Sequence, residues 1–406
     1  MEINSHTGSA LLDTLVRGRT EAARLVDGCA SAASGCHHTL REICQQPDTW
    51  RDTAERMPRH AGLIREVLAG ARSVTLTGSG SSEYAGECVR LALQRDLALD
   101  CHTLGGGVIL TQGVEALPTG RPGVMVSLAR SGDSPESVGA LRLLRSADAG
   151  IRHLVLTCNE RGSLAREQER AAVVVLDART NDRSLVMTSS FTNLCLAARF
   201  LGFAGSSEGV ARFRELGGKL AAACEAMIET HFDAIARMAR LPFRRAVFLG
   251  GGERYGAARE AALKLLEMTA GRLPTLAESF LGLRHGPMAY VHEDTLLVCF
   301  LSTDPLQRRY EYDLIAELNE KRVGEAKLLV GEAVPRELAR PGDHVIEIPG
   351  LAALGDANSA VLPVVVGQLL AFFRCLAEGL DPDSPSMNGV INRVVNSFTT
   401  HGVPAP

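Results

Sequence analysis

The chain has 406 residues, a length that favours two domains of ordinary size over one. Its 43 basic and 47 acidic residues give a formal net charge of −4, so bulk charge offers no case for binding nucleic acid or an anionic membrane. The longest apolar stretch, 360–373, is interrupted by Pro363 and Gln368 and is too short to span a bilayer. No basic segment followed by an apolar one is readable at the N-terminus, so we expect a cytoplasmic globular protein.

The ten cysteines are scattered along the chain and form no CxxC pair. Without a secretory signal, this pattern predicts reduced thiols rather than disulfides. His37 and His38, close to Cys36 and Cys44, are the one cluster with metal-ligand chemistry, and side chains on a helix are its more ordinary interpretation. We therefore expect no metal site.

Residues 1–58 are rich in Ala, Leu, Arg and Glu and predict an N-terminal helical extension, with Pro47 and Pro58 as punctuation. The segment is too small to form a core of its own. We expect it to pack on the rest of the chain or to form a subunit contact.

After Pro58, short apolar runs alternate with helix-like stretches. Strands are predicted at 73–77, 124–128, 153–157 and 173–176. This alternation is typical of a parallel sheet covered by helices on both faces.

The same order of strand and turn then recurs. Further strands are predicted at 246–249, 296–301 and 327–330, at a nearly constant offset of about 172 residues from the first set. An internal duplication explains three such units in register. We therefore predict an α/β fold with two similar lobes, 59–215 and 216–386, joined by a helical stretch at 191–229.

Hydroxyl groups gather in the two leading loops of the first lobe. Ligands of open α/β sheets bind beyond the carboxyl ends of the strands, where glycines let the backbone approach and helix N-termini offer free N–H groups. Serines add donors, and the combination suits a phosphate monoester, although a single Gly-Ser turn is more often a helix cap. The serines concerned are Ser79, Ser81, Ser82, Ser131 and Ser134.

Other phosphate-binding signatures fit less well. A dinucleotide fingerprint would need glycine where Glu83 stands, and no Walker lysine follows either loop. The equivalent loops of the second lobe, 250–254 and 302–305, have lost most of these hydroxyls. We therefore expect the first lobe to bind phosphate and the second to supply the chemistry.

Two patterns in the second lobe carry chemical groups. Glu260, Lys264 and Glu267 share one helix face, which by spacing alone indicates a solvated stripe of ion pairs. His285 lies in the loop 284–287 and, from the pattern alone, is a capping, core or catalytic histidine.

Taken together, the stretches 78–82, 127–137 and 284–287 and the Glu260, Lys264, Glu267 face resemble the sugar-isomerase (SIS) domain pair, which forms the isomerase half of glucosamine-6-phosphate synthase. The resemblance covers nearly the whole chain. It is closer to the galactosamine-6-phosphate deaminase/isomerase branch, also called tagatose-6-phosphate ketose/aldose isomerase, in four stretches: 41–47, 127–137, 187–192 and 388–395.

The resemblance implies roles for the loops of the first lobe. Ser81 and Ser82 match the family's first phosphate and sugar contacts. Arg130, Ser131 and Ser134 fall in its second phosphate loop. A sugar phosphate is thus the implied ligand, with no nucleic acid, membrane, metal or redox cofactor.

It also implies roles in the second lobe. Glu267 matches the glutamate that moves a proton between the first and second sugar carbons, and Lys264 on the same face tunes it or touches a hydroxyl. His285 matches the histidine that assists ring opening, which in the family reaches the active site of the neighbouring subunit. That implies a homodimer or larger assembly with shared active sites.

The sequence departs from the synthase in two ways. It has no glutaminase domain, and Glu2 stands where a cysteine would follow the first methionine, so glutamine-dependent synthesis is unsupported. The synthase's Schiff-base lysine is replaced by Asn396, with Arg393 nearby and no lysine after Lys327. We expect the tail 387–406 to close the site without a covalent bond to the sugar.

The implied activity is conversion of D-galactosamine 6-phosphate to D-tagatose 6-phosphate and ammonia. Two alternatives in the same class stay open from the residues alone: the protein could act as a deaminase of glucosamine 6-phosphate, or as a plain aldose–ketose isomerase that releases no ammonia. A sugar-phosphate-sensing regulator is disfavoured, because residues 1–58 contain no basic recognition helix and both Glu267 and His285 are present. A purely structural role would leave the hydroxyl-rich loops unexplained.

Overall fold

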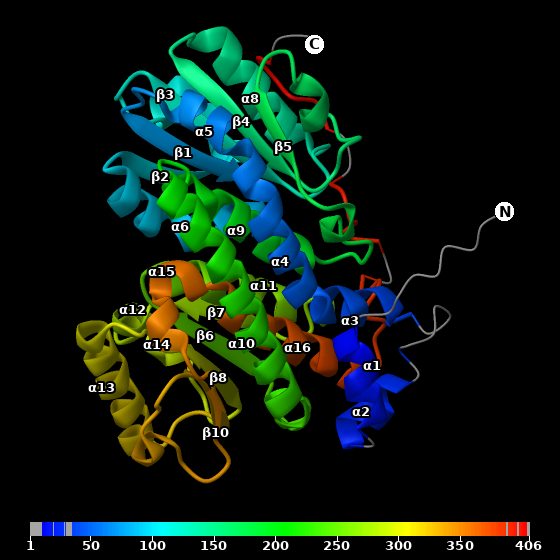
Figure 1. Cartoon of the computed structure of the whole chain (residues 1–406). Coiled ribbons are helices and arrows are strands. Elements are labelled where there is room, and N and C mark those ends of the chain that lie inside the picture. Colours follow the sequence, from blue (N-terminus) through cyan, green and yellow to red (C-terminus); the bar gives the residue numbers. More distant parts are fainter. Residues whose placement is uncertain are drawn as a thin grey trace, which may run out of the picture.

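The computed structural model describes residues 10–18, 20–27, 29, 35–386, 389–395 and 398–403. Within them, two five-stranded parallel sheets lie one above the other, with helices between and around them (Figure 1). The order of the first sheet is β2-β1-β3-β4-β5, and the second reads β7-β6-β8-β9-β10 in the same sense. The predicted duplication of an α/β lobe is confirmed.

In the first lobe, α7 and α8 cover one face of the sheet, and α5, α6 and α9 cover the other. The strands are β1 (Ser73–Gly78), β2 (Asp100–Gly105), β3 (Gly123–Ala129), β4 (Ile151–Thr157) and β5 (Ala172–Val175). The helices are α5 (Ala61–Leu68), α6 (Ser81–Leu97), α7 (Gly106–Gln112), α8 (Pro135–Ala147) and α9 (Ser189–Arg199), with short 3₁₀ turns at Gly113–Ala116, Leu164–Glu167, Ala178–Thr180 and Phe200–Gly202.

In the second lobe, α11 and α16 lie on the face toward the first lobe, and α12 and α13 pack on the opposite face. The strands are β6 (Arg245–Gly250), β7 (Thr275–Glu278), β8 (Thr295–Phe300), β9 (Ala326–Gly331) and β10 (His344–Glu347). The helices are α10 (Ser207–Ala239), α11 (Glu253–Met268), α12 (Phe280–Leu283), α13 (Pro305–Lys321), α14 (Leu351–Leu354), α15 (Asp356–Ser359) and α16 (Val361–Ala377), with 3₁₀ turns at Gly286–Tyr290 and Arg336–Leu338.

The two lobes share one continuous hydrophobic core around α6 and α11. The contact is very close at Gly256, where a Cβ atom would lie 2.7 Å from the backbone nitrogen of Cys88. A side chain at this position would push the helices apart. The predicted lobe boundary at 215/216 lies inside α10, a single 33-residue helix that the sequence indicated only as a helical stretch.

The N-terminal extension is helical, as predicted, and packs on the lobes. Its helices are α1 (Ala10–Arg17), α2 (Glu21–Asp27), α3 (His37–Cys44) and α4 (Gln46–Arg56), followed by a 3₁₀ turn at Met57–His60. Trp50 of α4 is fully buried and donates a hydrogen bond to the Thr192 hydroxyl of α9 over 2.9 Å. Pro47 begins α4, and Pro58 lies in the 3₁₀ turn that follows it.

The expectation that every cysteine is reduced is wrong in the extension. Cys29 and Cys36 form a disulfide, with their Cα atoms 5.0 Å apart. Spacing alone gave no sign of it, since the pair matches no familiar motif. The cysteines at 88, 101, 158, 195, 224, 299 and 375 are buried thiols.

No helix in the described part of the chain is long and apolar enough to cross a membrane. The described residues also contain no group of three or more His, Cys, Asp or Glu side chains arranged to hold a metal ion.

Candidate active site

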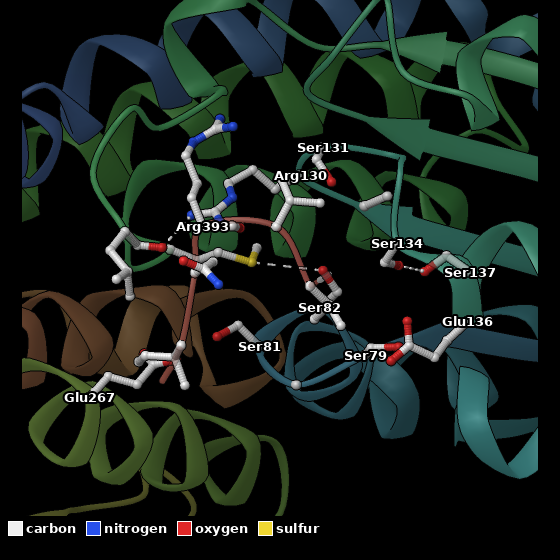
Figure 2. A pocket seen from close by; sticks show the side chains of 18 of the residues that line it. Ser79, Ser81, Ser82, Arg130, Ser131, Ser134, Glu136, Ser137, Glu267 and Arg393 are labelled. Carbon is white, nitrogen blue, oxygen red and sulfur yellow. Dashed lines mark hydrogen bonds between the residues drawn. The ribbon is translucent and has the colours of Figure 1, made fainter. Parts of the chain in front are cut away.

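A cavity of about 560 Å³ lies where the carboxyl ends of β1 and β3 face α11 of the second lobe. Figure 2 shows the serines of the first lobe opposite Glu267, with the C-terminal segment crossing between them. Of the predicted site residues, the cavity brings together Ser81, Ser82, Arg130, Ser131, Ser134, Lys264, Glu267 and Arg393.

The first wall is the turn from β1 into α6. Gly80 has a positive φ of 57°, and a Cβ on Gly78 would lie 2.5 Å from the Cβ of Ser82, so glycine is required at Gly78 and favoured at Gly80. The turn places Ser81 and Ser82 in the first turn of the helix, both 6% exposed. Hydroxyls and free N–H groups at one helix N-terminus form a favourable site for a phosphate group.

The second wall is the turn from β3 into α8. Ser134 is the N-cap residue of α8, and its hydroxyl bonds that of Ser137 over 2.7 Å. The Asn159 side chain stabilises the turn by donating a hydrogen bond to the Ser131 carbonyl over 2.8 Å. Two such hydroxyl-rich helix starts side by side suit a dianionic phosphate better than either would alone.

Ser79, one of the loop serines expected at the phosphate, also lines this part of the cavity, together with two residues that were not predicted: Glu136 and Ser137. The Ser79 hydroxyl and one Glu136 carboxylate oxygen are buried without a hydrogen-bond partner in the described part of the protein. Ser79 and Glu136 both line the cavity, Ser79 in the turn after β1 and Glu136 in the first turn of α8 (Figure 2). All of these residues lie inside the motif stretches 78–82 and 127–137, and this was the signal in the sequence that could have identified them as site residues.

The helix face predicted as a solvated stripe is buried, so that interpretation is wrong. Glu260 and Lys264 are fully buried, because α11 is enclosed by α6 and α16. The Lys264 ammonium lies 2.5 Å from Glu267 Oε2 and 3.0 Å from the Ser81 hydroxyl. It also forms an ion pair with Glu260 at 3.3 Å. Lys264 thus connects Ser81, in the turn of the first lobe where we expect the phosphate to bind, to Glu260 and Glu267 of the second lobe.

Burial and charge shift the acidities of this group. Burial raises the pKa of Glu260 to about 7, with the Lys264 charge acting in the opposite direction. Burial lowers the pKa of Lys264, but the charges of Glu260 and Glu267 outweigh it and leave that pKa above its ordinary value. Lys264 is therefore a cation at neutral pH and faces Glu267 at hydrogen-bond distance.

The two arginines of the cavity bond to backbone carbonyls. Arg130 donates to the Leu185 carbonyl over 3.0 Å and to the carbonyl of Arg393. Arg393 donates to the Asp182 carbonyl over 2.7 Å. Burial, together with the charge of Arg393, lowers the pKa of Arg130. Asn396 lies outside the described residues.

His285 is placed elsewhere. It is exposed, directly follows Arg284 at the end of α12, and does not line the cavity of its own chain. A single chain therefore does not bring His285 and Glu267 together.

The equivalent loops of the second lobe hold a carboxylate of the protein itself. Asp356 pairs with Arg254, which is 1% exposed, and accepts hydrogen bonds from the Ser302 hydroxyl and from the Thr303 backbone and hydroxyl, the latter two over 2.8 and 2.6 Å. Burial raises the pKa of Asp356, but Arg254 and these hydrogen bonds outweigh it and leave the pKa below its ordinary value of 3.8. In the second lobe, the Asp356 carboxylate thus occupies the position that corresponds to the hydroxyl-rich turns of the first lobe.

Asp356→Asn is expected to lower the free energy of unfolding at neutral pH by about 1.5–3 kcal/mol, the usual contribution of hydrogen bonds to a charged group. A lowered folded-state pKa contributes stability above the ordinary value of 3.8, and this is lost as pH falls through the folded-state pKa. Urea unfolding from pH 7 downwards should show the gap between wild type and variant closing below about pH 4. The exposed Asp313→Asn is the control, and a gap equal at every pH would contradict the assignment.

Two duplicated parallel lobes with a hydroxyl-rich cavity between them define the tandem sugar-isomerase architecture. No protein-family model matches the chain. It is 40% identical over 381 residues to a Streptomyces coelicolor protein provisionally named D-galactosamine-6-phosphate deaminase AgaS, covering 90% of this chain and 96% of the relative. It is 33% identical over 384 residues to the D-galactosamine-6-phosphate deaminase AgaS of Escherichia coli O157:H7, covering 92% and 97%.

A solved structure agrees with these relatives. The tagatose-6-phosphate ketose/aldose isomerase from Escherichia coli superposes with a TM-score of 0.78 at 30% identity, over 87% of this chain and 97% of that one. The chain belongs to the AgaS family of D-galactosamine-6-phosphate deaminases.

Proposed function

We propose that the protein converts D-galactosamine 6-phosphate and water to D-tagatose 6-phosphate and ammonia. The observation that carries this is Lys264, whose ammonium contacts both Ser81 at the phosphate wall and Glu267 on α11. A sugar anchored by its phosphate on the first lobe would have its other end near a carboxylate of the second. The choice of substrate is supported by relatives that match nearly the full chain and are named D-galactosamine-6-phosphate deaminases.

Substrate binding comes first. Ser81, Ser82, Ser131 and Ser134 hold the phosphate, which fixes the sugar and converts binding energy at a remote group into orientation at the reacting carbons. His285 of a partner subunit assists ring opening in the shared site of a homodimer, a role that its exposed position on this chain permits. Ring opening yields the free aldehyde with the amino group still on the second carbon.

Proton transfer follows. The Glu267 carboxylate removes the proton from the second carbon and returns it to the first, while a second proton passes from the amino nitrogen to the aldehyde oxygen. The aldehyde thereby becomes an alcohol and the amine becomes a ketimine. Water adds to the carbon–nitrogen double bond, and ammonia leaves as the ketone forms. Lys264 holds Glu267 in place throughout by its 2.5 Å contact. The sequence of steps balances without an electron carrier.

Ammonia release from galactosamine 6-phosphate and glucosamine 6-phosphate, assayed in parallel without added metal, tests the proposal. We expect ammonia and an equal amount of ketose phosphate from the galacto sugar. Ammonia from the gluco sugar alone would keep the mechanism and change the substrate. Isomerisation without ammonia would make the protein a plain aldose–ketose isomerase, and saturable binding without turnover would make it a sensor.

A further inference from the structure

A carboxylate of the N-terminal extension is buried beside the active site. Glu42, on α3, is 5% exposed. It accepts hydrogen bonds from the backbone N–H groups of Arg183 and Ser184 and contacts the Ser184 hydroxyl. All of these partners belong to residues 181–187, which we call the latch loop. Glu42 therefore ties the latch loop to the extension.

Glu42 has the features of a neutral acid. Burial raises its pKa to about 8, and the charge of Asp182 adds to this. The Ser184 hydroxyl also lies 3.2 Å from the Val186 carbonyl, so it can donate a hydrogen bond there while accepting one from the protonated carboxyl of Glu42. A glutamine would reproduce this pattern, because its carbonyl accepts from the N–H groups and its NH₂ donates to Ser184.

Asp182 fixes the start of the latch loop. Its carboxylate accepts hydrogen bonds from the backbone nitrogens of Thr188 and Ser190 over 2.8 and 2.9 Å, and from the hydroxyls of Ser189 and Ser190. These partners form the first turn of α9. The loop is thus held from α9 at one side and from Glu42 at the other.

The latch loop in turn holds the tail segment, residues 389–395. Arg393 donates to the Asp182 carbonyl over 2.7 Å and to the Asn181 side chain over 2.6 Å. Arg130 bonds the Leu185 carbonyl on the loop and the Arg393 carbonyl on the tail. Residues 390–395 of this segment form one wall of the cavity, and Figure 2 shows Arg393 and Arg130 side by side above it.

The residues that precede the tail segment are hydrogen-bonded to helix α3. Asp383 accepts hydrogen bonds from the backbone and hydroxyl of Thr39, both over 2.7 Å, at the start of α3. The Asp383 carbonyl also accepts from the Leu185 backbone over 3.0 Å. Helix α3, the latch loop and the tail therefore form one hydrogen-bonded unit.

We propose that Glu42 is a positioning residue that fixes the latch loop and, through Arg393, keeps the tail segment closed over the cavity. The N-terminal extension thereby controls how long a bound sugar phosphate is retained. The structural part of this inference is independent of the reaction, and only its kinetic consequence rests on the proposed function.

Trypsin cleavage after Arg393 measures tail release directly. Residues 394–406 contain no Lys or Arg, so cleavage of the 406-residue chain at this bond frees the single fragment 394–406, which mass spectrometry identifies. Trypsin reaches the peptide bond after Arg393 only when the tail opens locally. Glu42→Leu removes the hydrogen-bond acceptors of Glu42 but keeps a side chain of similar volume, so we expect the initial rate of cleavage to rise roughly tenfold. Glu42→Gln should cleave at nearly the wild-type rate. The control Glu55→Ala removes an exposed carboxylate of α4 that pairs with Arg214 and should change nothing.

Thermal unfolding shows whether each variant is folded. If Glu42→Leu is not, Ser184→Ala replaces it, because it removes the hydroxyl and leaves the backbone contacts with Glu42 intact; faster cleavage is again expected. A folded Glu42→Leu or Ser184→Ala that is cleaved at the wild-type rate would overturn the proposal. So would a Glu42→Gln variant as sensitive as Glu42→Leu, since the hydrogen-bond pattern would then be irrelevant.

Steady-state kinetics give a second readout. In Glu42→Leu we expect KM for galactosamine 6-phosphate to rise roughly tenfold, with kcat changed less, because Glu267 and Lys264 lie on a different element. If the wild-type protein releases no ammonia from either sugar, the proposed function fails. The proteolysis result would still support or refute the latch by itself.

Discussion

Glu267→Gln is expected to reduce ammonia release by about 10²- to 10⁴-fold, the usual contribution of one positioned acid–base group. The substitution keeps the size of the side chain and an oxygen that can accept from Lys264, so the cavity should keep its shape. It removes the carboxylate that takes the proton from the second carbon. Binding should be largely unchanged, because the phosphate contacts lie on the first lobe.

The measurement pairs turnover with calorimetric titration of galactosamine 6-phosphate into the variant. Glu229→Gln, an exposed carboxylate on α10, serves as the matched control and should behave as wild type. A Glu267→Gln variant that turns over at the wild-type rate would remove Glu267 from the mechanism. Loss of binding together with turnover would instead assign it to substrate binding.

Lys264→Met is expected to have the largest effect on stability. It leaves the fully buried Glu260 without its cation, and breaking a buried pair from one side typically costs about 3–5 kcal/mol of unfolding free energy. It should also abolish turnover, because Glu267 loses its 2.5 Å partner. Lys219→Met, on the exposed surface of α10, removes an ion pair with Glu215 and should cost less than about 0.5 kcal/mol.

The stability loss should depend on pH in a defined direction. The folded-state pKa of Glu260 is raised to about 7 from an ordinary value of 4.5, so ionising this carboxyl costs stability as pH rises through that window. In Lys264→Met the ionised form has no cation to offset the cost. The deficit relative to wild type should therefore be largest above pH 7 and shrink toward pH 5. A deficit that grows on acidification would contradict this account.

The strands that could be predicted from the sequence are mostly those buried inside each sheet. β1, β3, β4, β6, β8 and β9 have long apolar runs, because helices cover both of their faces. The prediction missed β2, β7 and β10, which lie at sheet edges and read DCHTLG, TLAE and HVIE. The fourth edge strand, β5, was predicted at 173–176 because its sequence AVVV is a continuous apolar run, which the other three edge strands lack.

The site shows a similar division. Ser81, Ser82, Ser131 and Ser134 could be predicted because glycine-rich turns after strands place them at one edge of the sheet. The burial of Glu260 and Lys264 could not, since helix spacing does not say what encloses the helix. Glu42 and the latch loop were not identified as functional, because their contacts join segments about 140 residues apart.

The close contact between Gly256 and Cys88 has a consequence for how substrate enters. Helix α6 presents Ser81 and Ser82, α11 presents Lys264 and Glu267, and the two helices interlock too tightly to swing apart without exposing the shared core. Rocking of one lobe against the other is therefore a poor route for opening. Under the closure that we propose for residues 389–395, the rate at which this segment leaves the cavity sets an upper limit on sugar exchange.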